Sequence, residues 1–137
     1  MAKTVATILG VAFILVGIVG FIVGQSANPM EANFIGTHLT LYHNLVHIIS
    51  GAIALYFGLA GSLSGARLFC IIFGIVYGLL GVCGLLLGSG PGRILPIDDL
   101  LMLGTMDHIL HILLGVVFLI GGFTTRADLA PPPPTSL

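Results

Sequence analysis

Charged side chains are scarce in this 137-residue chain, which has four Lys and Arg residues and five Asp and Glu residues, 7% of the total against 57% hydrophobic. A water-soluble domain carries about 25% charged residues, so the composition excludes a soluble globule. The formal net charge of −1 provides no basic surface, which argues against binding to nucleic acid. The long uncharged stretches predict a helical protein whose solvent is the lipid bilayer.

Cysteine and catalytic motifs are equally sparse. The two cysteines, Cys70 and Cys83, lie on one predicted helix, about 20 Å apart along its axis, too far for a mutual disulfide. The chain contains no nucleophile triad, phosphate-binding loop or zinc-protease motif. The sequence offers no support for a hydrolase or a kinase and leaves open whether the protein is an enzyme.

Apolar runs predict the fold. Each run has about the 20 residues that a helix needs to cross a bilayer, and no alternating strand pattern accompanies them. We therefore expect an all-α, membrane-embedded four-helix bundle with spans at 4–24, 39–61, 68–88 and 97–123. Residues 1–126 form the membrane domain, and the proline-rich residues 127–137 are expected to be a flexible tail.

The few positive charges predict the orientation of the bundle. Lys3, Arg67 and Arg126 fall on one side of the predicted membrane, and Arg93 falls on the other. Since cytoplasmic loops are enriched in Lys and Arg, both termini are expected in the cytoplasm. The connection Gly61–Gly65 is then a short cytoplasmic loop.

The chain resembles itself at an offset of 64 residues, which predicts two tandem two-helix repeats, 1–64 and 65–126. Two spans per unit give both copies the same orientation, so equivalent residues lie at equal depth. The repeat includes two series of glycines seven residues apart, which favour close helix packing or, alternatively, a groove for a flat cofactor. These glycines are Gly10, Gly17, Gly24, Gly74, Gly81 and Gly88.

Polar residues gather at corresponding positions of the second and fourth spans. Each set falls within about a 100° arc of its helix, on an otherwise small-residue face that we expect to point inward. The repeat matches His47 with His111, His43 with Asp107, and Asn44 with His108. Ionisable residues inside a membrane are costly and commonly mark a functional site.

Several chemistries suit this cluster. His47 and His111 could be the axial ligands of a heme b, and imidazole also suits a chlorin. Alternatively, a transition-metal ion could be bound by His43, His47, His108, His111 and Asp107. Asn44 and Asp107 could support the ligating imidazoles through hydrogen bonds. Interhelical hydrogen bonding without a ligand, and the handling of a proton, an ion or a quinone, remain open as well.

The segments His43–His47 with Gly51 and Asp107–His111 with Gly115 resemble the motifs of a family of small four-helix bacterial membrane proteins catalogued as a domain of unknown function. The resemblance covers nearly the whole chain apart from the proline tail. It implies a bacterial inner membrane or a thylakoid membrane and carries no activity.

Two functional hypotheses follow from the sequence. In the first, the inward His/Asn/Asp cluster binds a heme or a metal ion. In the second, the protein is a non-catalytic accessory subunit of a larger membrane complex, such as a respiratory or photosynthetic one, in which the cluster holds the helices together or ligates a pigment. Because little of the protein lies outside the membrane, we expect it to function in an assembly, either with other membrane-protein subunits or with identical copies of itself.

Overall fold

The computed structural model describes residues 1–24, 31–34, 36–97 and 101–126. This part of the chain folds into four long helices: α1 (Ala2–Gly24), α2 (Leu41–Leu55), α3 (Leu63–Leu87) and α4 (Thr105–Phe123). A π-helical turn, η1 (Tyr56–Ala60), extends α2. With η1 added to α2, all four are long and apolar enough to cross a membrane. The predicted all-α membrane bundle is confirmed.

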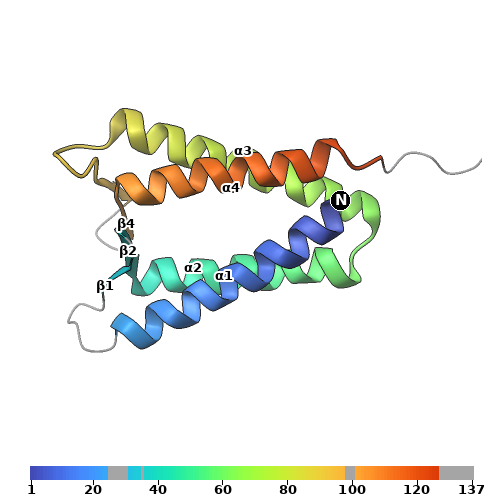
Figure 1. Ribbon diagram of the computed structural model, residues 1–137, viewed down its shortest axis with the longest axis horizontal. Coiled ribbons are helices and arrows are strands. Elements are labelled where there is room, and N and C mark those ends of the chain that lie inside the picture. Colours follow the sequence, from blue (N-terminus) through green and yellow to red (C-terminus); the bar gives the residue numbers. More distant parts are fainter. Residues whose placement is uncertain (25–30, 35, 98–100, 127–137) are drawn as a thin grey trace, which may run out of the picture.

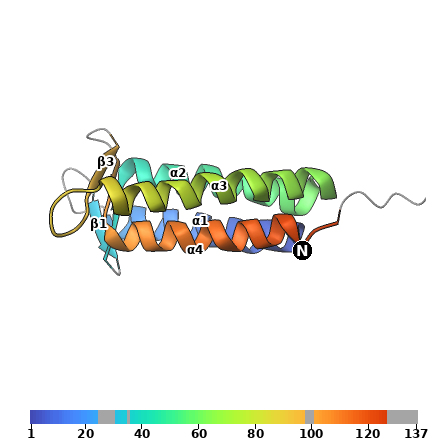
Figure 2. The same ribbon diagram turned by 90° about the horizontal axis from the view of Figure 1, so that it is seen from above.

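The helices pack as two layers. One layer contains α1 and α2 and the other contains α3 and α4, and Figure 1 shows the layers close together at one end and apart at the other. In the view of Figure 2, α2 and α3 lie on one side of the bundle and α1 and α4 on the other. Both described ends of the chain lie where the layers meet, which we call the terminal end. The two layers are farther apart near the opposite end.

Small side chains explain the close approach at the terminal end. Ala2 and Ala6 of α1, and Ala66 and Cys70 of α3, are fully buried there. The backbone N–H of Ala2 donates a hydrogen bond of 2.7 Å to Oγ1 of Thr125, which ties the start of the chain to the end of α4. Both cysteines are free.

Two β-hairpins occupy the opposite end, which we call the hairpin end (Figure 1). The first pairs β1 (Glu31–Phe34) with β2 (Thr37–Thr40), and the second pairs β3 (Leu95–Ile97) with β4 (Leu101–Leu103), both antiparallel. No strands were predicted here, and the predicted spans 39–61 and 97–123 begin within these segments, so their first residues were wrong. Proline lacks the backbone N–H that a helix needs, and β3 contains Pro96.

Capping interactions set the true helix boundaries. Oγ1 of Thr40 accepts a hydrogen bond from the backbone N–H of His43, so α2 begins at Leu41. Oγ of Ser62 accepts from the N–H of Gly65, so the expected five-residue loop is shorter and α3 begins at Leu63. The predicted tail, 127–137, lies outside the described residues.

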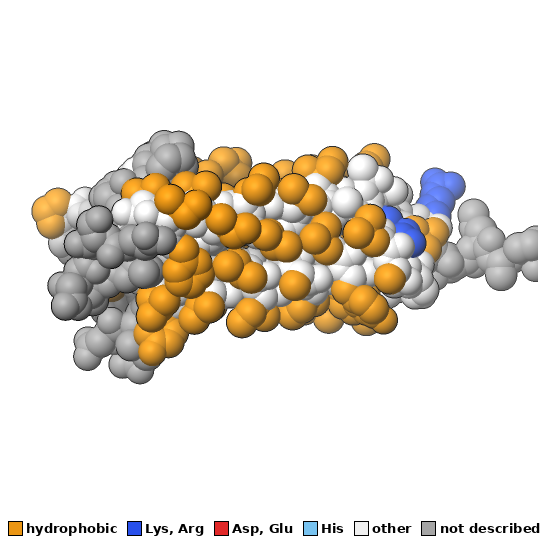
Figure 3. Space-filling model, turned by 90° about the horizontal axis from the view of Figure 1, so that it is seen from below, with side chains coloured by type: hydrophobic (Ala, Val, Ile, Leu, Met, Phe, Trp, Pro, Cys, Tyr) orange, Lys and Arg blue, Asp and Glu red, His pale blue; other side chains and the backbone are white. Residues whose placement is uncertain are grey.

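The outer surface of the helices is apolar along most of their length. Figure 3 shows hydrophobic side chains covering one face of the bundle, with Lys and Arg at the terminal end. Ile8, Leu59, Leu86 and Leu87 are all more than 60% exposed. Such a surface is stable only against lipid, so the bundle is an integral membrane protein.

Candidate functional site: a histidine chamber between the layers

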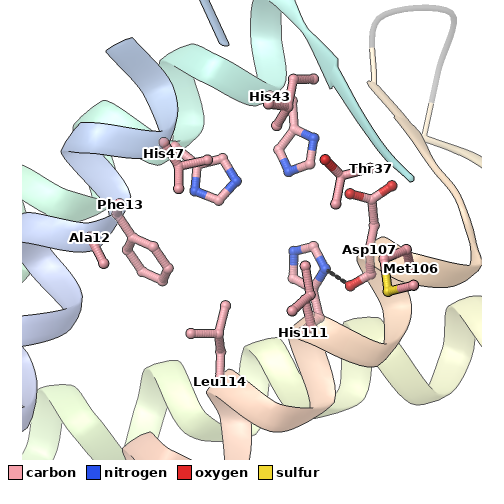
Figure 4. A pocket seen from close by; sticks show the side chains of 12 residues that line it. Ala12, Phe13, Thr37, His43, His47, Met106, Asp107, His111 and Leu114 are labelled. Carbon is pink, nitrogen blue, oxygen red and sulfur yellow. Dashed lines mark hydrogen bonds between the residues drawn. The ribbon is translucent and has the colours of Figure 1, made fainter. Parts of the chain in front are cut away.

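Three imidazoles share one space between the layers, towards the hairpin end. His43 and His47 come from α2 and His111 comes from α4, and their exposed fractions are 3%, 8% and 6%. Figure 4 shows the three rings directed into a common cavity. We call the space around these three residues the histidine chamber.

The larger cavity of the chamber has a volume of about 350 Å³ and lies between α1 and α4. Its polar end is formed by the three histidines with Thr37 and Asp107. Its other lining residues are apolar, and three of them, Val16, Met106 and Leu110, are 36–41% exposed on the outer surface. The cavity therefore opens sideways, towards the lipid.

A smaller cavity of about 190 Å³ lies between α2 and α3 and is lined by the same three histidines. Its further polar groups are the hydroxyls of Ser50 and Tyr77. Several lining residues of the two cavities lie 64 positions apart: Ala12 and Val76, Phe13 and Tyr77, Val16 and Leu80, and Leu39 and Leu103. These lining residues of the two cavities occupy matching positions of the predicted repeat, although the chemistry of the cavities differs.

Backbone carbonyls fix the protonation of two of the imidazoles. Nδ1 of His43 lies 2.7 Å from the carbonyl oxygen of His38, and Nδ1 of His111 is hydrogen-bonded to the carbonyl oxygen of Asp107. A carbonyl only accepts hydrogen bonds, so each Nδ1 carries the proton and donates. In the neutral ring, Nε2 then presents a lone pair.

Some of these nitrogens are buried without a partner. Within the described part of the chain, Nε2 of His43 and Nδ1 of His47 have no hydrogen-bond partner. Leaving a buried polar atom unsatisfied costs about 1–3 kcal/mol. Such atoms commonly mark a site that another molecule completes.

Aromatic rings close the chamber on the side of the terminal end. Phe13 packs edge-on to His47, and Tyr77 packs against His111, with centroid distances of 5.4 and 5.2 Å. Phe118 lies behind Phe13 and Tyr77 and is fully buried. The polar lining therefore ends at this aromatic floor.

Asp107 acts mainly on backbone groups. Its Oδ2 accepts hydrogen bonds from the N–H of Gly104 at 2.9 Å, at the start of α4, and from the N–H of His38 at 3.1 Å, in β2. The carboxylate therefore caps α4 and joins the first hairpin to it. The sequence analysis matched Asp107 with His43 through the repeat, and the structure connects them through His38, whose carbonyl binds His43.

The other matched pair, Asn44 and His108, lies apart. A Cβ added at Gly20 of α1 would collide with the Asn44 amide, and one added at Gly84 of α3 would collide with the His108 ring. Nε2 of His108 donates to the carbonyl oxygen of Arg93 at 2.8 Å. The two residues thus pack within separate layers, and neither lines a cavity of the chamber.

The geometry bears on a metal ion as well. Among the residues that the structure describes, no group of three or more His, Cys, Asp or Glu side chains is arranged to hold a metal. Of the five ligands considered from the sequence, four line the larger cavity, and His108 is the exception.

The glycine series face helix backbones. A Cβ at Gly10 or Gly17 would meet residues of α2, and one at Gly74 or Gly81 would meet residues of α4, within 2.5–3.0 Å. Gly88 faces the carbonyl of Arg93, and Gly24 is buried. The partner helix therefore fills the groove at Gly10, Gly17, Gly74 and Gly81, which argues against a flat cofactor beside these four glycines.

Sequence reasoning missed part of the lining. Phe13, Thr37 and Ser50 line the chamber, although they resemble ordinary residues of a membrane helix or loop. The offset of 64 carried a signal, because it matches Phe13 with Tyr77, the tyrosine in the middle of α3. Arg93 was treated only as a charge, whereas its carbonyl anchors His108.

Fold and site together define a four-helix integral membrane protein with a buried histidine chamber that opens to the lipid. The chain belongs to the family described as Domain of unknown function (DUF4383), whose model matches residues 3–124. The predicted family resemblance is confirmed. Neither the curated proteins nor the solved structures contain a match.

Proposed function

We propose that this protein binds a lipid-soluble ligand in the histidine chamber, and that imidazole nitrogens donate their lone pairs to it. The observation that carries this proposal is the buried Nε2 of His43, which has no partner among the described residues and lies beside an apolar cavity. A ligand that accepts this lone pair would remove the cost of burying it.

Two kinds of ligand accept a lone pair from imidazole. A metal centre does so directly, and a heme b, a chlorin or a transition-metal ion would use His47 and His111, with His43 beside them. The carbonyl of Asp107, which holds Nδ1 of His111, is the kind of support that ligating histidines have. A hydroxyl group does so by donating a hydrogen bond to the imidazole nitrogen.

The apolar opening between α1 and α4 favours entry from the bilayer. A ligand with an apolar body can lie along Ala12, Leu110 and Leu114 while its polar head reaches the imidazoles. The aromatic floor of Phe13, Tyr77 and Phe118 argues against a polar path across the membrane. We therefore favour binding over transport of ions.

The test is to identify what the protein retains when it is purified in mild detergent from its own membranes. Oxidised and dithionite-reduced absorption spectra detect a heme or a chlorin, elemental analysis detects a metal, and mass spectrometry of a solvent extract detects an organic ligand. We expect one bound group in the wild-type protein and its loss in His47→Ala and His111→Ala. His38→Ala, a histidine outside both cavities, should retain it.

A wild-type protein that carries no bound group by any of the three methods would overturn the proposal. So would equal retention in all three variants. The accessory-subunit hypothesis predicts that the wild-type protein carries no bound group and co-purifies with a larger membrane complex. In that case the cluster would only hold the helices together.

A further inference from the structure

The histidine chamber has two polar ends with different chemistry. At the first, Nε2 of His43 accepts a hydrogen bond and cannot donate one, because Nδ1 carries the proton and donates it to His38. At the second, Tyr77 and Ser50 line the smaller cavity. A hydroxyl group can both donate and accept a hydrogen bond, so this end can serve either kind of partner.

Several neighbouring rings around the chamber have small interplanar angles, although Phe13 is edge-on to His47. His43 makes interplanar angles of 27° with His47 and 17° with His111. Tyr77 makes angles of 30° with His111 and 13° with Phe13. Offset stacking is a favourable arrangement for flat rings, so another flat ring can join this set with its face against its neighbours.

The two cavities share the three histidines as lining residues, and their other lining residues lie mainly on α1 and α4 for the larger cavity and on α2 and α3 for the smaller one. A flat head group with a polar atom on each of two opposite edges could therefore reach both polar ends at once. An apolar tail could leave between α1 and α4, where the lining is exposed to lipid.

We infer that the ligand of the histidine chamber is a lipid-soluble quinol, an aromatic ring with two hydroxyl groups and an apolar tail. This inference rests on the proposed function and specifies its ligand. One hydroxyl donates to Nε2 of His43, and the other pairs with Tyr77 and Ser50. Because His43 only accepts, the site prefers the quinol over the quinone, whose oxygens carry no hydrogen.

The preference can be measured with three probes of one shape: a decyl-tailed benzoquinol, its quinone, and the dimethyl ether of the quinol. Their binding to the full-length protein in lipid nanodiscs is measured by equilibrium binding under anaerobic conditions. Losing one hydrogen bond to a buried partner weakens binding by about tenfold. We expect the quinol to bind about tenfold more tightly than the quinone, and the dimethyl ether to bind most weakly.

Two tyrosine variants localise the site. Tyr77→Phe keeps the ring and removes the hydroxyl, and it should weaken quinol binding by about tenfold. Tyr42→Phe is the matched control, because Tyr42 is 44% exposed and lines neither cavity. Quinol binding to Tyr42→Phe should equal that of the wild type.

Equal binding of quinol and quinone would overturn the inference, and so would equal effects of the two tyrosine variants. Failure of all three probes to bind to a protein that retains a heme or a metal at His47 and His111 would overturn it while the proposed function stands. Failure of the probes together with the absence of any bound group would overturn both.

Discussion

Individual atoms at the histidine chamber decide what it can bind. In His43 and His111, one ring nitrogen donates a hydrogen bond to a backbone carbonyl, which leaves the other nitrogen with a lone pair. His108 uses Nε2 in the same way, on Arg93, but its ring lies against Gly84 within the α3–α4 layer. Histidines of one motif thus acquire different roles, because their positions on the helix face different neighbours.

Gly84 provides a test of this packing at the residue scale. A Cβ at Gly84 would collide with the His108 ring, so Gly84→Ala should lower the stability by about 1–3 kcal/mol. The control is Gly78→Ala on the same helix, where an added Cβ meets nothing within 4 Å. Since alanine favours helix over glycine, this variant should be as stable as the wild type or more so.

Thermal unfolding in detergent measures both glycine variants. The order expected for the midpoints is Gly78→Ala at or above the wild type, with Gly84→Ala below both. A Gly84→Ala protein as stable as Gly78→Ala would mean that the His108 ring does not lie against α3.

Elements are held in place by their ends. Thr40, Ser62 and Asp107 accept hydrogen bonds from backbone N–H groups at the starts of α2, α3 and α4. Asp107 also binds the N–H of His38, so a single carboxylate fixes α4 and the first hairpin, whose His38 carbonyl in turn orients His43. The cap of α4 is therefore also a support of the chamber.

Substitution of Asp107 tests this link. Asp107→Ala removes the acceptor of two backbone N–H groups and should destabilise the protein by about 1–3 kcal/mol. Asp107→Asn keeps an acceptor oxygen and should retain at least half of that stability. Thermal unfolding compares the two variants, and equal losses in both would show that the charge, rather than the capping hydrogen bonds, is what matters.

The sequence predicted the elements better than their ends. The lengths of the apolar runs were sufficient to predict four spanning helices, because few structures other than a helix are stable in lipid for such runs. The hairpins were missed because Leu39, Leu95 and Ile97 are as apolar as helical residues, and only Pro96 and Thr40 indicate the boundary. Helical periodicity was sufficient to predict the polar cluster on α2 and α4. Which of its residues line the chamber and which pack within a layer depends on tertiary contacts with Gly20 and Gly84.

At the scale of the whole molecule, the two layers meet at the terminal end and separate around the chamber. Lys3, Arg67 and Arg126 belong to the terminal end, and Arg93 belongs to the hairpin end. Positively charged residues are retained on the cytoplasmic side. We therefore predict that the terminal end is cytoplasmic and that the chamber lies in the outer half of the membrane.

Reporter fusions measure this orientation. A green fluorescent protein fused after Leu137 should fluoresce, since it folds in the cytoplasm, and alkaline phosphatase at the same place should be inactive. Alkaline phosphatase inserted after Gly90, in the connection between α3 and β3, should be active. The opposite pattern would reverse the predicted orientation.

The central claim, that the cavity between α1 and α4 holds a ligand, is tested most directly by filling that cavity. Ala12 lines it, so Ala12→Phe places a large ring in the ligand's space without altering a histidine. Its neighbour Val11 is 46% exposed and lines neither cavity, which makes Val11→Phe the matched control. The measurement is the amount of bound group per protein after purification in mild detergent. We expect wild-type occupancy in Val11→Phe and loss of the bound group in Ala12→Phe, whereas equal occupancy in both variants would contradict the account.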